Sequence, residues 1–292
     1  MDCMRKYDYN CMMRDLHALR EKYPALRTGS AGYSVCGREL PWMAAGRGKK
    51  TLLMLGTHHG REYVASMFLM RLMEEHLACG EEELFRGAQL VMIPMVNPDG
   101  AELSIHGENA ADKRIAAMPR RWGDYASWKA NANGVDLNRN YPCLWEKKQV
   151  IIGEPASEMY NGPRPASEPE VRAVMAFAEE LSADLAVTMH TKGEEILYGD
   201  ANTPHLWAES RAYAEVIAGC SGYAILPPSL DPAVYGAGFE NWFRERFSRP
   251  CILVEAGRYD GPQPFREERF EREIWQKLGK IGRELLFRLI YT

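Results

Sequence analysis

The chain has 292 residues, of which 46% are hydrophobic, and a formal net charge of −4. This length and composition predict a single domain with a large core. The charge balance excludes nucleic acid and anionic membrane surfaces as partners, because both need clustered Lys and Arg. The longest apolar stretch, 64–70, ends at Arg71, far short of the roughly 20 residues of a membrane span.

Two further features indicate the compartment. Residues 1–14 carry charges throughout and do not resemble a secretion signal. None of the seven cysteines forms a C-x-x-C pair: Cys3, Cys11, Cys36, Cys79, Cys143, Cys220 and Cys251. We therefore expect reduced thiols and a cytoplasmic location.

The first third of the chain alternates between helical and strand patterns. Spacing of apolar residues predicts a helix over 9–23, which ends before Pro24. Residues 31–36 and 40–45 are typical of hairpin strands around a glycine, and 51–55 is an apolar run typical of a buried strand. This segment predicts a helix, a hairpin and a first central strand.

The next segment repeats the pattern of a strand followed by a helix. A helix is predicted over 62–78, after the motif THHGRE. A buried strand over 89–96 ends in Asn-Pro-Asp-Gly, which predicts a turn. The stretch 101–165 lacks periodicity, and long loops within compact domains are usually functional. We expect it to form the wall of a cleft.

Regular structure resumes after this loop. Ser167 and Glu170 have the spacing of a capping box that opens a helix. Strands are predicted over 184–190, 222–226 and 251–255, and helices over 205–219 and 266–289. The alternation predicts an α/β fold with a mixed, mostly parallel central sheet of about eight strands and helices on both faces. We expect one domain over 1–292, with the helix and hairpin of 1–50 packed as part of it.

A histidine and a carboxylate lie three positions apart in the THHGRE motif. His59 and Glu62 can therefore reach one ion, although His58 is an alternative ligand at a spacing of four. A catalytic zinc takes three protein ligands and leaves one position open. His190 ends a predicted central strand, and the carboxyl ends of such strands share one edge of the sheet. It is the candidate for the third ligand.

Five motifs occur in order along the chain: HGRE, NPDG, the segment GVDLNRN at 134–140, His190 at a strand end and Glu255 on a strand. Together they resemble the zinc metallocarboxypeptidase family over nearly the whole chain. The resemblance implies that His59, Glu62 and His190 hold one zinc ion and that Glu255 is the general acid/base. It also implies that Asn138 and Arg139 bind a carboxylate of the substrate, a role that suits a planar guanidinium.

The sequence departs from the family where many members place an arginine that stabilises the oxyanion. Lys129 stands at the matching position, and Arg120 and Arg121 are alternatives for the same role. The segment WKANANGVDLNRN is similar to bacterial γ-D-glutamyl-diamino acid peptidases and murein-peptide amidases. That resemblance implies a peptidoglycan stem peptide as substrate, whose diaminopimelate offers a carboxylate and an ammonium.

The segment 235–242 resembles the flexible loop and specificity wall of the family. Tyr235 matches the family's mobile tyrosine, and Glu240 falls at its selectivity position. A carboxylate there attracts a cationic group. The alternative is a glycine-rich turn with an exposed glutamate.

These observations lead to four functional hypotheses. The first is hydrolysis of the γ-D-Glu–diaminopimelate bond in a peptide or muropeptide that carries a free carboxylate. The others are a C-terminal carboxypeptidase for basic residues, a zinc-dependent N-acyl amino acid deacylase and a peptide-binding protein without catalysis. The presence of all four expected zinc and acid/base positions favours an enzyme.

Overall fold

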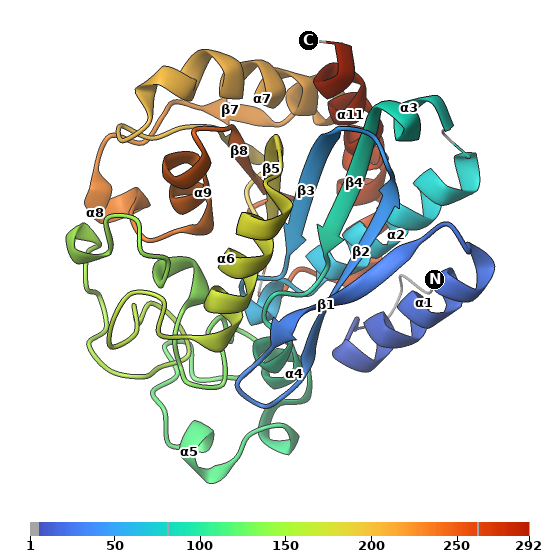
Figure 1. Cartoon of the computed structure of the whole chain (residues 1–292). Helices are drawn as coiled ribbons and strands as arrows, with labels where there is room; N and C mark the ends of the chain where they lie inside the picture. The colour runs from blue at the N-terminus through green and yellow to red at the C-terminus, as the bar shows by residue number, and fades with distance from the viewer. Residues whose placement is uncertain (1–5, 81, 262, 292) are drawn as a thin grey trace.

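The computed structural model of the chain describes residues 6–80, 82–261 and 263–291. One sheet contains eight strands in the order β1-β2-β4-β3-β5-β8-β6-β7 (Figure 1). The strands are β1 (Arg27–Tyr33), β2 (Glu39–Gly46), β3 (Lys50–Gly56), β4 (Ala88–Ile93), β5 (Leu185–His190), β6 (Glu195–Leu197), β7 (Ala224–Leu226) and β8 (Cys251–Glu255).

The four central strands β4, β3, β5 and β8 run parallel to one another. β2 joins β4 antiparallel at one side, and β6 joins β8 antiparallel at the other. Every residue of β5 is buried, as expected for a strand covered on both faces. The predicted α/β fold with a mixed eight-stranded sheet is confirmed.

Helices cover both faces of the sheet (Figure 1). Their bounds are α1 (Tyr9–Lys22), α2 (Val64–Cys79), α3 (Glu82–Gly87), α4 (Pro98–His106), α5 (Lys113–Ala116), α6 (Pro169–Leu181), α7 (Trp207–Ser221), α8 (Pro232–Tyr235), α9 (Phe239–Phe247), α10 (Gln276–Leu278) and α11 (Ile281–Tyr291). Among the residues with described positions, no helix has the length and apolarity needed to cross a membrane.

Alternation along β3 divides the core into two layers. Leu52 and Met54 pack with α1, α2, α7 and α11, whereas Leu53 and Leu55 pack with α6 and α9 on the opposite face. Successive side chains of a strand point to opposite faces, which explains the division. Met12 of α1 belongs to the first layer, so the N-terminal helix shares the main core.

The prediction of a turn at Asn-Pro-Asp-Gly is wrong, because this segment starts helix α4. The Asn97 side chain accepts a hydrogen bond from the Gly100 amide at 2.9 Å, and Pro98 occupies the first helical position. Both are favoured at a helix start. Turn residues and helix starts share the same local chemistry, which explains the error.

The predicted capping box is also wrong. Helix α6 begins at Pro169, and the Ser167 hydroxyl donates to the neighbouring Glu168 carboxylate at 2.6 Å. The Glu170 carboxylate instead accepts from the amide of Val35 at 3.0 Å. Glu170 therefore links helix α6 to the loop between β1 and β2.

Other boundaries differ from the predictions where elements are short or irregular. The first hairpin strand begins at Arg27 rather than at 31, and the strand predicted over 222–226 covers only Ala224–Leu226. The helix predicted over 266–289 contains a π-helical turn at Glu271–Trp275 and breaks before α11. Strand β6 and helix α8 were not predicted, since elements of three or four residues show no measurable period. Helix α3, with six residues, and helix α9, with nine, were also not predicted.

Candidate active site

Each expected zinc or acid/base residue lies at the carboxyl end of a parallel strand. His59 and Glu62 follow β3, with Glu62 closing the 3₁₀ turn Gly60–Glu62. His190 and Glu255 are the last residues of β5 and β8, and they pair directly in the sheet register. This edge is where open α/β sheets place ligand sites.

Two glycines fix the turn that carries His59 and Glu62. The Gly60 amide donates to the carbonyl oxygen of Lys129 at 3.0 Å. A Cβ on Gly60 would lie 2.2 Å from the Gly100 backbone at the start of α4, closer than any side chain tolerates. The close approach holds the turn against both α4 and the long loop.

The side chains of His59, Glu62 and His190 converge on one point. The His59 Nδ1 lies 2.9 Å from Glu62 Oε1 and 3.2 Å from His190 Nδ1. The His190 Nδ1 lies 3.0 Å from Glu62 Oε2. All three residues are buried. Within the described ranges they form one of two groups of potential metal ligands.

These distances fit a tetrahedral zinc site. Two neutral imidazole nitrogens that face each other need a shared cation or proton between them. With Zn–N bonds of about 2.0–2.1 Å, two nitrogens of a tetrahedral site lie about 3.3 Å apart. The observed 3.2 Å between the two Nδ1 atoms matches that value. The donor set is therefore suitable for zinc and leaves a position for water or substrate.

His58, the alternative ligand, points elsewhere. Its Nε2 lies 3.1 Å from the hydroxyl of Tyr141, and its ring stacks on His190 with the centroids 5.7 Å apart. Burial lowers the pKa of His58 to about 3, so the ring is neutral. His58 packs behind the metal-binding side chains.

Each histidine of the cluster has a carboxylate on its outer side. The His59 Nε2 lies 3.2 Å from Asp136 Oδ1, and the His190 Nε2 lies 3.6 Å from Glu240 Oε1. Burial opposes ionisation of Asp136, but the charges of Lys129 and His59 outweigh it and hold its pKa well below its usual range. Such outer carboxylates orient histidines that bind zinc.

Sequence reasoning did not assign Asp136 to the site. Asp136 belongs to the GVDLNRN segment, and its burial is almost complete at 1% exposure. The available signal was the general pairing of zinc-binding histidines with carboxylates, together with an aspartate next to the predicted substrate-binding pair.

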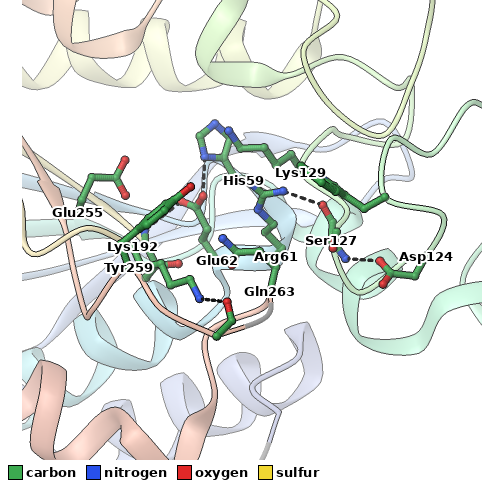
Figure 2. Close-up of a pocket in the computed structure, with 13 residues that line it drawn as sticks. His59, Arg61, Glu62, Asp124, Ser127, Lys129, Lys192, Glu255, Tyr259 and Gln263 are labelled. Atoms are coloured by element: carbon green, nitrogen blue, oxygen red, sulfur yellow. Dashed lines mark hydrogen bonds and ion pairs between the residues drawn. The ribbon is translucent and has the colours of Figure 1, made fainter.

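A cavity of about 590 Å³ opens in front of the cluster (Figure 2). This volume is within the usual range for ligand pockets. In this view Lys129 and Glu255 lie on either side of His59 and Glu62. The lining residues are His59, Arg61, Glu62, Trp122, Asp124, Ser127, Lys129, Thr191, Lys192, Glu255, Tyr259, Gly261 and Gln263.

Glu255 faces this cavity from the end of β8. Burial, and next the negative charge of Glu62, raise the pKa of Glu255 above its usual value. A carboxylate of raised pKa beside the metal-binding cluster is suited to proton transfer.

The structure separates the three candidates for oxyanion stabilisation. Lys129 lines the same cavity as His59 and Glu62. Arg121 forms an ion pair with Glu158 at 3.2 Å, and the Arg120 guanidinium lies 4.7 Å from the centre of the Tyr125 ring. Of these three cations, Lys129 is the one that faces the cluster. Arg61 also lines the cavity, although sequence reasoning did not single it out.

Three of the remaining predicted residues line a second, smaller cavity of about 170 Å³, whereas Arg139 is not among its lining residues. Asn138, Tyr235 and Glu240 all line it. Glu240 also faces His190, so it lies between this cavity and the metal cluster. The Arg139 Nε lies 3.6 Å from the Asp136 carboxylate, and its Nη1 donates to the Gln149 carbonyl oxygen at 3.4 Å.

The alternative reading of 235–242 as a turn with an exposed glutamate is wrong. Glu240 is only 5% exposed and lies in the first turn of helix α9. The glycines that suggested a turn end before the helix, because Gly238 is its N-cap. Sequence reasoning placed Glu240 in a loop because the pattern of α9 was not recognised.

Comparisons with known proteins agree with this fold and site. A family model described as zinc carboxypeptidase matches residues 12–222, and the chain belongs to that family. A gamma-D-glutamyl-L-diamino acid endopeptidase 1 of Lysinibacillus sphaericus is 30% identical over 289 residues, which cover 94% of this chain and 71% of the relative.

Solved structures show the same fold at lower identity. Thrombin-activatable fibrinolysis inhibitor matches with a TM-score of 0.76 and 17% identity, over 99% of this chain and 75% of that one. The murein-tripeptide amidase MpaA of Escherichia coli O157 matches with a TM-score of 0.52 and 21% identity, over 90% of this chain and 89% of that one. The family match identifies the chain as a zinc metallopeptidase, and the solved structures share its fold.

Proposed function

We propose that this enzyme hydrolyses the bond between γ-D-glutamate and diaminopimelate in peptidoglycan stem peptides. The observation that carries the proposal is a cluster suited to zinc, His59, Glu62 and His190, beside a cavity that contains Glu255. The choice of substrate is supported by the relative from Lysinibacillus sphaericus, which is named for this type of bond and is similar to 94% of this chain.

The acid/base step belongs to Glu255. One zinc ion held by His59, Glu62 and His190 would lower the pKa of a bound water toward about 7 and polarise the scissile carbonyl. Glu255 accepts a proton from the attacking water as the new C–O bond forms. It then passes that proton to the leaving nitrogen as the C–N bond breaks.

Other side chains stabilise and position the substrate. Lys129 places a positive charge where the carbonyl oxygen becomes negative. Asn138 and Arg139 hold the free carboxylate of the leaving diamino acid, and the guanidinium suits that group. Asp136 keeps His59 in the orientation that directs its Nδ1 toward the cluster.

The direct test uses L-Ala-γ-D-Glu-meso-diaminopimelate and the purified chain. We expect mass spectrometry to detect released diaminopimelate, with loss of release after chelation and recovery on addition of zinc. The Glu255→Gln variant serves as the inactive control. An absence of zinc-dependent release from the wild-type enzyme would exclude this substrate.

A second candidate is a carboxypeptidase for C-terminal basic residues. The observation in its favour is the Glu240 carboxylate, which lines the second cavity and attracts cations. A panel of peptides ending in Lys, Arg or Phe distinguishes the two. Faster release of Lys or Arg than of diaminopimelate would favour this candidate.

We also propose a cytoplasmic location. No disulfide joins the described cysteines, which fits a reducing compartment: Cys11, Cys36, Cys79, Cys143, Cys220 and Cys251. Cys3 lies outside the described residues. Cell fractionation tests the location, and recovery of the protein outside the cytoplasmic fraction would contradict it.

A further inference from the structure

The second cavity contains groups of both charges. Lys148 and Glu240 line the same space of about 170 Å³, which is large enough for one side chain of a substrate. Glu240 lies next to His190 of the metal cluster, 3.6 Å from its Nε2. A side chain that enters this cavity from the scissile bond therefore meets a carboxylate and an ammonium.

Among the residues that the structure describes, no carboxylate forms an ion pair with the Lys148 ammonium. The residue is only 8% exposed, and its Nζ donates to the carbonyl oxygen of Val234, which has no net charge. Burial, and next the positive charge of Arg139, lower the pKa of Lys148 to about 8. A buried cation without a paired charge is costly, so an anion supplied by a ligand would stabilise it.

The second cation of this cavity is already paired within the protein. Arg244 also lines it, but its Nη2 forms an ion pair with Asp200 at 2.8 Å. The Oε1 of Glu240 faces Thr188 and His190, whereas its Oε2 lies 3.3 Å from the side-chain amide nitrogen of Asn138. Lys148 is thus the cation of this cavity that can engage a ligand carboxylate.

We propose that this cavity binds the zwitterionic far end of a diamino acid side chain, with Lys148 contacting its carboxylate and Glu240 its ammonium. The inference rests on the proposed function and adds a specificity-determining residue to it. Diaminopimelate carries one carboxylate at that end, and lysine lacks it. Lys148 therefore makes the enzyme prefer stem peptides with diaminopimelate over those with lysine.

The reason for discrimination is the cost of an uncompensated buried charge. A site built around a polar group rejects an analogue that lacks its partner far more strongly than an apolar pocket does. With a lysine substrate, the cavity would hold two ammonium groups and one carboxylate. With diaminopimelate, each charge of the ligand meets its opposite.

The test compares two tripeptides, L-Ala-γ-D-Glu-meso-diaminopimelate and L-Ala-γ-D-Glu-L-Lys. We expect the ratio of their kcat/KM values to favour diaminopimelate by at least about tenfold in the wild type, from one charge-assisted hydrogen bond. Lys148→Met should lower this ratio about tenfold or more. The control is Lys147→Met at the exposed neighbour, which should leave the ratio unchanged.

An equal effect of Lys148→Met on both tripeptides would overturn the inference, and so would an unchanged ratio. If this variant does not fold, as judged by thermal unfolding, the wild type is compared on a tripeptide whose far carboxyl group is amidated. We expect the same loss of about tenfold there, and equal rates would contradict the inference. If the wild type cleaves neither tripeptide, the proposed function itself fails and this assignment fails with it.

Discussion

Two groups of buried charges lie close together in this protein, and their hydrogen bonding differs sharply. Around Asp200, the Oδ2 accepts from Asn241 at 2.8 Å and from the Arg244 Nε at 2.9 Å, while the Oδ1 accepts from the Asn202 amide at 2.9 Å. The Arg244 Nη1 donates to the Cys251 carbonyl oxygen at 2.6 Å. These polar groups satisfy one another.

The candidate zinc ligands His59, Glu62 and His190 do not satisfy one another in this way. The Nδ1 atoms of His59 and His190 face each other at 3.2 Å, and both also face the Glu62 carboxylate. Glu62 and Glu255 add two carboxylates, and burial, and next the negative charge of Glu62, raise the pKa of Glu255. Satisfied buried charges hold the fold, whereas crowded and unsatisfied ones indicate a site for a ligand.

The largest expected effect tests the functional side of this comparison. Glu255→Gln removes the proposed proton acceptor but retains the shape of the side chain, so kcat should fall about 10²–10⁴-fold. Zinc content and the unfolding temperature should stay close to those of the wild type. Steady-state kinetics and metal analysis check both, and an unchanged kcat would exclude Glu255 as the acid/base.

For the satisfied group around Asp200, we expect a substitution to lower the free energy of unfolding. Arg244→Met leaves the Asp200 carboxylate buried without its cation, which should cost about 3–5 kcal/mol of unfolding free energy. The matched control is Arg246→Met on the same helix, where the 2.9 Å ion pair with Glu179 is exposed. It should cost less than about 1 kcal/mol. Urea unfolding measures both, and equal losses would contradict the distinction.

The next effect concerns the oxyanion. Lys129→Ala should lower kcat about 10²–10³-fold, because it removes the cation that faces the metal cluster. Lys129→Arg should recover part of this loss, and Arg121→Ala should change kcat little. A loss from Arg121→Ala as large as that from Lys129→Ala would show that the wrong cation has been assigned.

The smallest effect concerns metal affinity. Asp136→Asn weakens the partner of His59, so zinc affinity should fall about 10- to 100-fold. Competition with a chelator of known affinity measures it. Affinity equal to that of the wild type would mean that Asp136 does not orient His59.

Sequence reasoning was most successful where periodicity and sheet topology determine position. His190 and Glu255 end apolar runs, and parallel strands bring such ends to one edge. Asp136 was not found because spacing along the chain does not reveal which carboxylate reaches His59. Lys148 lies in the long loop, where the absence of a period leaves side-chain placement to tertiary contacts.

Local signals also misled where two structures share the same residues. Asn97 and Pro98 are typical of turns and of helix starts, and only the packing of α4 against the Gly60 turn distinguishes them. The choice of Lys129 over Arg121 likewise depended on the Glu158 carboxylate that binds Arg121. The sequence shows which residues are cations, but it does not show which carboxylate each cation pairs with.

Calorimetric titration of the chelator-stripped protein with zinc tests the central claim most directly. The site formed by His59, Glu62 and His190 predicts one zinc per chain, with hydrolytic activity that rises in proportion to occupancy, and loss of that binding in His190→Ala. Full activity of the stripped protein, or undiminished zinc binding by folded His190→Ala, would contradict the account.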